Sequence, residues 1–166
     1  MALFYPNIYK NRITDITVTD LHTWGVKGLL LDVDNTLTTH GSQELSDEVR
    51  DWLEEMKNAG IRMTVVSNSW EWRVAPFAKK IGLRHTSLSC KPSPFGFMRG
   101  VRRLGLKKSE CLAIGDQVFT DIIGANLYGI RSVQVMPILL EEGKPFLKLK
   151  RRIERKLYEK RKGQNV

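Results

Sequence analysis

The strongest constraint on the fold is a regular alternation of short apolar runs with longer segments of helical periodicity. The apolar runs lie at residues 28–34, 61–66, 111–114 and 130–135. Each is too short for a helix and is apolar on successive residues, as buried strands of a parallel sheet are. Apolar residues recur at helical spacing in 45–56, 70–81, 97–104 and 120–128. The alternation predicts an α/β fold, an open Rossmann-like parallel sheet flanked by helices.

The net charge is concentrated in one part of the chain. The 166 residues, about one domain in length, carry 27 Lys and Arg against 18 Asp and Glu, a net charge of +9. Residues 144–166 contain ten basic and two acidic side chains, so this segment holds +8 and residues 1–143 hold +1. We therefore predict a nearly neutral domain over 1–143 and a separate basic segment over 144–166. The charge does not by itself indicate a nucleic-acid-binding domain.

The basic segment has the pattern of an amphipathic C-terminal helix. Phe146, Leu149, Ile153 and Leu157 follow one another at spacings of three or four residues and share one face. This stripe could dock on the domain, or residues 144–162 could make a peripheral contact with an anionic membrane. Binding of RNA or a ribosomal partner uses the same charge. Nucleic acid is the less favoured partner, because no aromatic interleaving or nucleic-acid-binding motif accompanies the charge.

The sequence predicts a cytoplasmic protein. Its first residues lack the basic and apolar regions of a secretory signal, and no apolar run approaches the length of a membrane span. If the basic segment contacts lipid, the protein would lie at the inner face of the membrane. Oligomeric state is not predicted.

Four individual side chains carry predictions about burial. Cys90 and Cys111 are expected to be free thiols that pack as small buried side chains. Trp70 falls on the apolar stripe of the helix expected over 70–81, so it is predicted to lie in the core. Trp72 falls off that stripe and is predicted to be exposed.

Polar side chains capable of chemistry follow the expected strands. Carboxyl ends of parallel strands meet at one edge of a sheet, where α/β proteins bind ligands. Clustered carboxylates need a cation among them, and an all-oxygen site suits Mg²⁺. A lysine and a hydroxyl beside such a metal suit phosphate, so the set indicates phosphoryl transfer. The candidate residues are Asp32, Asp34, Ser67, Asn68, Lys91, Asp116 and Asp121.

These residues carry a family resemblance. The words Asp32-Val-Asp-Asn-Thr-Leu37, Val66-Ser-Asn68, Lys91-Pro92 and Gly115-Asp-Gln-x-x-Thr-Asp121 resemble, in order, the four motifs of the haloacid dehalogenase (HAD) superfamily. They are most similar to the YqeG-type branch of the HAD-IIIA hydrolases, which is related to the mitochondrial phosphatidylglycerophosphatases. The resemblance extends from Val18 to Arg155. Each motif alone is weak, but four in order at successive expected strand ends are specific.

The resemblance implies catalytic and metal-binding roles. Asp32 would be the nucleophile that forms an aspartyl-phosphate. Asp34 would protonate the leaving oxygen and then deprotonate the attacking water. Mg²⁺ would be held by the carboxylates of Asp32 and Asp116 and by the backbone carbonyl of Asp34.

The resemblance also implies how phosphate is held. Ser67, Asn68 and Lys91 would bind the phosphoryl oxygens, Asn68 through its backbone amide. Asp121 would orient Lys91 or a metal-bound water, although it could equally be an ordinary acidic residue in the first turn of a helix. The link from Asn35 to Glu44 is too short for a cap domain, so we expect an open site.

The combined prediction is a Mg²⁺-dependent phosphomonoesterase that forms an aspartyl-phosphate. By resemblance its substrate would be the lipid phosphatidylglycerophosphate, and soluble sugar or nucleotide phosphates are the alternative. A hypothesis of another class is a HAD-fold module that acts on RNA or the ribosome through its basic segment. The intact pair Asp32 and Asp34 favours the enzyme, because a binding module needs neither carboxylate.

Overall fold

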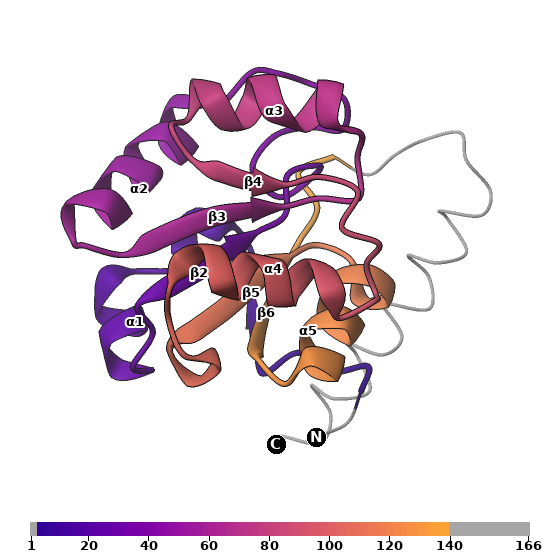
Figure 1. The fold of residues 1–166 in the computed structure, drawn as a ribbon. Helices are drawn as coiled ribbons and strands as arrows, with labels where there is room; N and C mark the ends of the chain where they lie inside the picture. Colours follow the sequence, from indigo (N-terminus) through magenta and orange to yellow (C-terminus); the bar gives the residue numbers. More distant parts are fainter. Residues whose placement is uncertain (1–2, 140–166) are drawn as a thin grey trace.

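The computed structural model describes residues 3–139, so the basic segment 144–166 lies outside the described residues. One sheet of parallel strands forms the centre of the molecule (Figure 1). Its strand order is β1-β6-β5-β2-β3-β4. The strands are β1 (Ile8–Lys10), β2 (Gly28–Leu31), β3 (Arg62–Val66), β4 (Arg84–Thr86), β5 (Cys111–Gly115) and β6 (Arg131–Val135). The predicted α/β parallel fold is confirmed.

Helices connect successive strands. They are α1 (Val18–Thr23), α2 (Asp47–Asn58), α3 (Glu71–Lys80), α4 (Phe95–Leu104) and α5 (Ile123–Tyr128). Two short 3₁₀ turns, η1 (Ile13–Asp15) and η2 (Lys108–Glu110), and one π-helical turn, η3 (Val118–Ile122), complete the described elements. The sequence predicts α2 to α5, but it misses α1, β1 and β4, and it does not predict that η3 precedes α5.

Helices cover both faces of the sheet, because successive side chains of a strand point to opposite sides. Leu29 and Leu31 of β2 pack into a core with α2 and α3, whereas Leu30 packs into a second core with α4 and α5. Figure 1 shows α4 and α5 together on the near side of the sheet. A strand buried on both faces has to be apolar throughout, which explains the unbroken run Gly28–Leu31.

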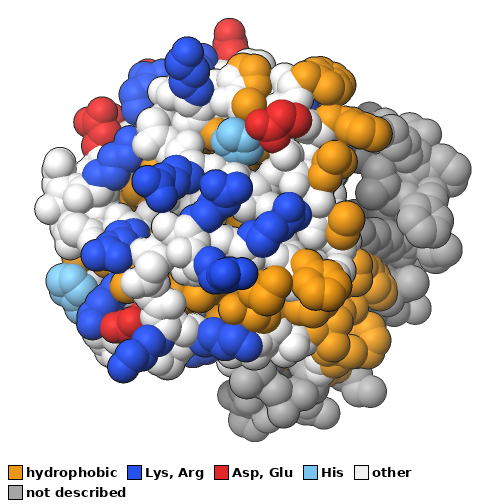
Figure 2. Space-filling view, viewed as in Figure 1, with side chains coloured by type: hydrophobic (Ala, Val, Ile, Leu, Met, Phe, Trp, Pro, Cys, Tyr) orange, Lys and Arg blue, Asp and Glu red, His pale blue; other side chains and the backbone are white. Residues whose placement is uncertain are grey.

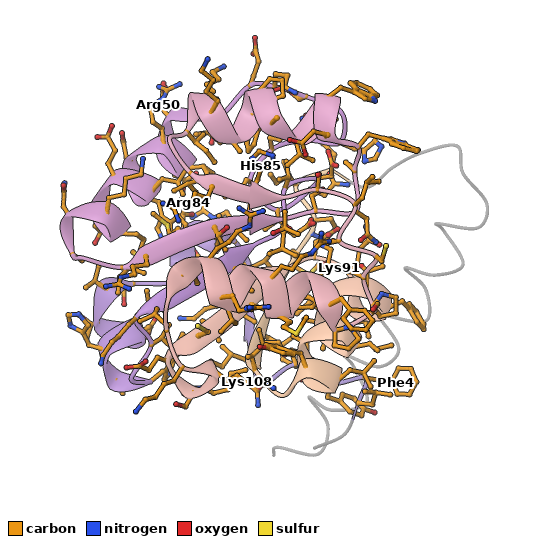
Figure 3. The ribbon with its side chains drawn as sticks, viewed as in Figure 1. Phe4, Arg50, Arg84, His85, Lys91 and Lys108 are labelled. Carbon is orange, nitrogen blue, oxygen red and sulfur yellow. The ribbon has the colours of Figure 1, made fainter. Side chains whose placement is uncertain are left out.

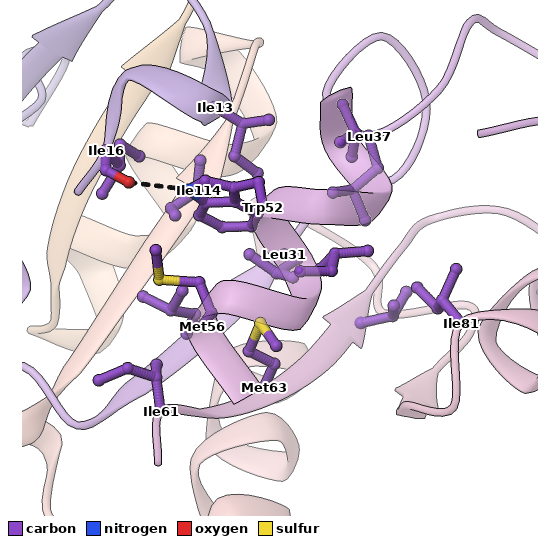
Figure 4. Close-up of a cluster of buried hydrophobic side chains, with 14 of the residues drawn as sticks. Ile13, Ile16, Leu31, Leu37, Trp52, Met56, Ile61, Met63, Ile81 and Ile114 are labelled. Carbon is purple, nitrogen blue, oxygen red and sulfur yellow. Dashed lines mark hydrogen bonds between the residues drawn. The ribbon is translucent and has the colours of Figure 1, made fainter. Parts of the chain in front are cut away.

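The first core contains a buried hydrogen bond between a side chain and the backbone (Figure 4). The indole nitrogen Nε1 of Trp52 on α2 donates to the backbone carbonyl of Ile16 at 2.7 Å. Trp52 is 4% exposed and Ile16 is fully buried. The bond satisfies both polar groups away from water and fixes the segment before α1 against α2.

The side on which successive strands join the sheet changes at two adjacent central strands, β2 and β5. From β2 the chain proceeds through β3 to β4 at one edge, then returns to β5 on the other side of β2 and continues to β6. In open α/β sheets, the crevice at the carboxyl ends of the strands at such a point is the usual ligand site. The fold therefore positions a site beyond the ends of β2 and β5.

Two of the four predictions on individual side chains are wrong. Trp70 is 62% exposed, because α3 begins at Glu71 and Trp70 precedes its first turn, outside the helical periodicity. Cys90 is exposed, because it lies in the irregular loop after β4. The exposure of Trp72, at 75%, and the burial of Cys111 are confirmed.

Between residues 3 and 139, we find no helix with the length and apolar character needed to span a membrane.

Candidate active site

The end of β2 places Asp32 at the centre of the sheet edge. The backbone N–H of Asp32 donates to the carbonyl of Ile114 at 3.0 Å, which continues the pairing of β2 with β5 by one residue. Three residues later Asn35 has a left-handed backbone with φ of 63°, a conformation that asparagine tolerates. Its N–H bonds to the carbonyl of Thr38 at 2.7 Å and closes a tight loop. The loop turns the chain away after Asp32, so Asp32 and Asp34 can face different partners.

Lys91 is the centre of a buried ion-pair cluster. Its Nζ lies 2.6 Å from Asp32 Oδ1 and 2.6 Å from Asp121 Oδ1, and it donates to the carbonyl of Val66 at 2.9 Å. Only 3% of the Lys91 side chain is exposed. Figure 3 shows Lys91 near the start of α4, at the carboxyl ends of the strands. Burial alone would lower the pKa of this ammonium, but the carboxylates of Asp121 and Asp32 outweigh burial and raise it above the ordinary value. Lys91 is therefore a permanently charged group.

Three carboxylates converge on this cluster. One oxygen from each of Asp32, Asp116 and Asp121 lies within 4.8 Å of the other two, and all three residues are buried. Burial, together with the charges of Asp121 and Asp116, raises the pKa of Asp32 to about 8, although Lys91 opposes this effect. Three carboxylates around one ammonium leave negative charge uncompensated. A divalent cation that prefers oxygen ligands, such as Mg²⁺, fits this donor set.

Asp121 is held in place from both sides. Its Oδ1 accepts from Lys91, and its Oδ2 accepts from the backbone N–H of Gln117 at 3.1 Å. A Cβ at Gly115, the last residue of β5, would overlap the Asp121 carboxylate. The close approach of η3 to the end of β5 therefore requires glycine there. Both arrangements considered for Asp121 are present, because its carboxylate contacts Lys91 and the residue also lies in the first turn of η3.

Asp34 faces a second cation that the sequence analysis did not single out. Arg73 Nη2 lies 2.9 Å from Asp34 Oδ1, and the guanidinium is buried, with 9% of the side chain exposed. The same Oδ1 accepts from the backbone N–H of Gly41 at 3.0 Å, and Oδ2 accepts from the Ser69 hydroxyl at 3.0 Å. Burial raises the pKa of Asp34, but the Gly41 hydrogen bond, Arg73 and Ser69 together lower it below the ordinary value. Asp34 is thus an ionised carboxylate, able to accept a proton.

The sequence contained a signal for Arg73 that we overlooked. Arg73 lies next to Val74 and four residues before Phe77, so it falls on the buried face of α3. A charged residue on an apolar stripe needs a buried partner. The guanidinium lies 5.9 Å from the Phe77 ring centre on one side and contacts Asp34 on the other.

Asn68 organises the loop that carries Lys91. Its side-chain Nδ2 donates to the carbonyl of Lys91 at 2.9 Å, and its Oδ1 accepts from the N–H of Lys91 at 2.7 Å and from the Ser89 hydroxyl at 2.9 Å. The side chain is therefore engaged within the protein, which leaves its backbone for the predicted phosphate contact. Ser67 is 2% exposed at the end of β3, and its hydroxyl accepts from the N–H of Ser69 at 3.1 Å. Phosphate binding by Ser67 and Asn68 stays a prediction.

Comparison with known families and proteins gives matches over most of the chain. A model of haloacid dehalogenase-like hydrolases matches residues 39–129, and a model of mitochondrial PGP phosphatases matches residues 1–75. The chain is 37% identical over 163 residues to the probable phosphatase YqeG of Bacillus subtilis (strain 168), covering 96% of this chain and 94% of that protein. It is 30% identical over 151 residues to phosphatidylglycerophosphate phosphatase 1, chloroplastic/mitochondrial, of Arabidopsis thaliana, covering 84% of this chain but 43% of the plant protein.

Solved structures share the fold. An uncharacterized protein from Listeria monocytogenes serotype 4b superposes with a TM-score of 0.58 at 20% identity, covering 72% of this chain and 85% of that chain. CbbY from Rhodobacter sphaeroides, solved in complex with phosphate, superposes with a TM-score of 0.51 at 17% identity, covering 73% and 90%. At such identities the likeness concerns the fold alone.

Proposed function

Because this chain belongs to the haloacid dehalogenase-like hydrolases and is a phosphatase, we propose that it hydrolyses phosphate monoesters through an aspartyl-phosphate on Asp32, with Mg²⁺ as cofactor. The observation that carries this proposal is the buried contact between Lys91 and Asp32, 2.6 Å long, at the point where the chain changes direction across the sheet. A buried carboxylate held by a permanent cation and surrounded by further carboxylates matches the needs of phosphoryl transfer.

In the first step, a carboxylate oxygen of Asp32 attacks phosphorus. The new bond joins that oxygen to phosphorus, and the ester P–O bond breaks. The leaving oxygen keeps the electron pair of that bond and takes a proton from the carboxylic acid form of Asp34, which becomes a carboxylate. Lys91 contacts Oδ1 of Asp32 and offsets negative charge beside the reacting group throughout. Asp121 keeps the ammonium in position through its own 2.6 Å contact.

In the second step, water attacks phosphorus of the aspartyl-phosphate. Its proton passes to a base, the bond between phosphorus and the Asp32 oxygen breaks, and inorganic phosphate leaves with the carboxylate restored. The carboxylate of Asp34 is the candidate base, since Arg73, Ser69 and Gly41 keep it ionised and orient it. The proton accepted here is the one that Asp34 can donate to the next leaving oxygen.

The carboxylates of Asp32 and Asp116 and the backbone carbonyl of Asp34 would hold Mg²⁺. Bound there, the ion supplies positive charge that offsets the carboxylates and the phosphoryl oxygens. The donor set supports this assignment, because the clustered groups are oxygens and their charge exceeds that of Lys91.

For the substrate, we propose the phosphate monoester of a phospholipid headgroup, phosphatidylglycerophosphate. The supporting facts are the 30% identity to the Arabidopsis enzyme over 84% of this chain and the match of residues 1–75 to the PGP phosphatase family. The link between Asn35 and Glu44 leaves no room for a cap domain, and an open site admits a headgroup that is part of a larger assembly.

The test compares Asp32→Asn with Asp51→Asn, which changes an exposed carboxylate on α2 in the same way. We expect Asp32→Asn to lose at least about 10³-fold in kcat on an aryl phosphate and on phosphatidylglycerophosphate in detergent micelles, with its circular dichroism unchanged. Asp51→Asn should keep full activity. Full activity in Asp32→Asn would refute the nucleophile, and hydrolysis of aryl phosphate without hydrolysis of the lipid would refute the substrate.

A further inference from the structure

Large apolar side chains are exposed around the candidate site. Trp70 is 62% exposed, Trp72 75%, Leu88 42% and Phe95 65%. All four follow the carboxyl ends of strands, the two tryptophans after β3 and the other two after β4. We call these four residues the apolar rim. Single exposed apolar residues are common, but four on adjoining loops mark an interaction surface.

The segments that carry the rim contact one another and the site. The backbone N–H of Leu88 donates to the carbonyl of Ser69 at 3.0 Å, which ties the loop after β4 to the start of α3. A Cβ at Gly96 would lie 2.6 Å from Cβ of Ser89, so the first turn of α4 packs directly on this loop. Lys91 lies between Leu88 and Phe95 in the same loop. Figure 2 shows hydrophobic side chains gathered along one edge of the molecule.

A basic surface adjoins the rim. Residues 72–109 contain no acidic residue and ten basic ones. Two of them, Arg73 and Lys91, are buried in the site. The other eight are exposed, and we call them the basic face: Lys79, Lys80, Arg84, Arg99, Arg102, Arg103, Lys107 and Lys108. Figure 2 shows Lys and Arg side chains gathered beside the hydrophobic edge.

One residue of the basic face reaches the rim directly. The guanidinium of Arg99 on α4 donates to the backbone carbonyl of Leu88 at 3.4 Å. The carbonyl belongs to a residue whose left-handed backbone, with φ of 42°, is rare for leucine and accompanies an exposed side chain. Arg99 therefore brings a cationic group to the border of the apolar rim beside the site.

We propose that the apolar rim and the basic face together dock the protein on an anionic lipid bilayer, with the Asp32 site turned toward the headgroups. The proposal rests on the proposed function and names the surface that presents the site to its substrate. Tryptophan and phenylalanine side chains favour the interface between headgroups and acyl chains, and Lys and Arg favour anionic lipids. A nucleic-acid backbone would match the basic face but would leave the rim exposed to water, so a bilayer fits both surfaces.

The experiment measures sedimentation of the full chain with vesicles. The vesicles contain either equal parts of phosphatidylglycerol and phosphatidylcholine or phosphatidylcholine alone. The rim variant is Trp72→Ala with Phe95→Ala, and the control is Leu127→Ala, which removes a side chain 54% exposed on α5. Leu127 lies near the end of α5, before the start of β6, whereas the apolar rim follows the carboxyl ends of β3 and β4. Because every variant keeps residues 144–166, the charge of that segment is constant.

We expect the wild type and the control to bind the anionic vesicles and not the zwitterionic ones, and the rim variant to bind at least about tenfold more weakly. Aryl phosphatase activity in solution should be the same in all three, since within residues 3–139 neither Trp72 nor Phe95 hydrogen-bonds or ion-pairs with the cluster around Lys91. Equal vesicle binding by the rim variant would overturn the proposal.

Two further outcomes separate the alternatives. Binding to a single-stranded RNA probe that survives the rim substitutions, without binding to vesicles, would replace the bilayer by nucleic acid. A dimer that dissociates in the rim variant, again without vesicle binding, would assign the rim to a second copy of the chain. Vesicle binding without any hydrolysis by the wild type would support docking and refute the proposed function instead.

Discussion

Arg73 is the side chain whose environment is hardest to explain without a role in the reaction. Its guanidinium is buried between the Phe77 ring and the Asp34 carboxylate, and Nη1 has no hydrogen-bond partner among residues 3–139. An incompletely satisfied buried cation costs free energy, which a contact useful only for folding rarely offsets. We interpret Arg73 as a positioning residue that orients Asp34.

Replacement of Arg73 by Met should lower kcat by about 10- to 100-fold, because Asp34 transfers a proton during the reaction. KM should change little, because Asp34 does not bind the substrate. The loss should be larger for an alkyl phosphate than for p-nitrophenyl phosphate, whose leaving group departs without a proton. Steady-state kinetics on both substrates measures this difference, and Arg73→Lys should restore part of the rate.

The matched control for this substitution is Arg50→Met, which removes an exposed arginine from α2. Equal losses on the two substrates, or no recovery with lysine, would make Arg73 a purely structural residue.

Residue-level predictions from the sequence failed where a helix boundary decided the outcome. Periodicity placed Trp70 in the core, but α3 begins one residue later. The same reading passed over Arg73, although it lies on the buried face. Helical periodicity predicts which side chains are buried only for residues inside the helix. An error of one residue at the start of the helix therefore predicts burial for a side chain that is exposed. The predictions for the acidic residues at strand ends did not depend on the position of a helix boundary.

At the level of elements, the junction of β5 with η3 controls the position of Lys91. Gly115 ends β5, and its missing side chain leaves the space that the Asp121 carboxylate occupies. Asp121 in turn contacts Lys91, which contacts Asp32. The π-helical turn widens the first turn after the strand and brings Asp121 back over the strand end. A backbone feature thus sets the geometry of a charged cluster.

Gly115→Ala should therefore lower kcat by about tenfold or more and reduce the free energy of unfolding by about 1–3 kcal/mol, because the added methyl group displaces Asp121. Activity assays and urea denaturation measure the two effects. If the effect on rate passes through Asp121, then Gly115→Ala combined with Asp121→Asn should be no slower than Asp121→Asn alone. Additive losses would show that Gly115 acts by another route.

The sequence predicted the central elements better than the edges. β2, β3, β5 and β6 were predicted because strands with neighbours on both sides or helices on both faces need continuous apolar runs. β1 and β4 have three residues each and include Lys10, Arg84 and His85, so neither has such a run. An edge strand is defined by backbone pairing with a neighbour, which the side-chain pattern does not record.

At the level of the whole molecule, the parallel sheet explains why the site could be anticipated. Carboxyl ends of parallel strands lie on one edge whatever their order, so Asp32 and Asp116 could be expected on the same edge. The pairing of β2 with β5 then brings the two residues together. The apolar rim could not be anticipated in this way, because its residues lie in loops and helix ends whose exposure depends on packing. The predicted boundary near residue 143 and the roles of 144–166 remain predictions.

Binding of Mg²⁺ should be visible as a change in the stability of the whole chain. A ligand that binds only the folded state adds about 2.7 kcal/mol at a concentration one hundred times its Kd. We expect millimolar Mg²⁺ to raise the Tm of the wild type by several degrees, and EDTA to remove both that increase and the activity. Asp116→Asn should abolish the increase, because it removes one of the clustered carboxylates.

Without metal, Asp116→Asn should melt at or above the wild-type temperature, because it also removes a negative charge from a cluster with excess negative charge. Asp47→Asn on the exposed first turn of α2 is the control and should keep the full response to Mg²⁺. A normal response in Asp116→Asn would contradict the assignment of the metal site.

The pairing of β1 with β6 has a consequence for how the protein is made. Ile8 and Val133 are register partners, so β1 pairs with a strand that is synthesised 125 residues later. At about 5–20 residues per second, β1 waits on the order of 6–25 s for β6 to be synthesised. In the last part of that interval, after β5 has been synthesised and before β6 follows, β5 has an unpaired edge. The sheet is therefore complete only when its last strand, β6, has been synthesised. Until then, the unpaired edge of β5 is the edge that a chaperone would need to shield.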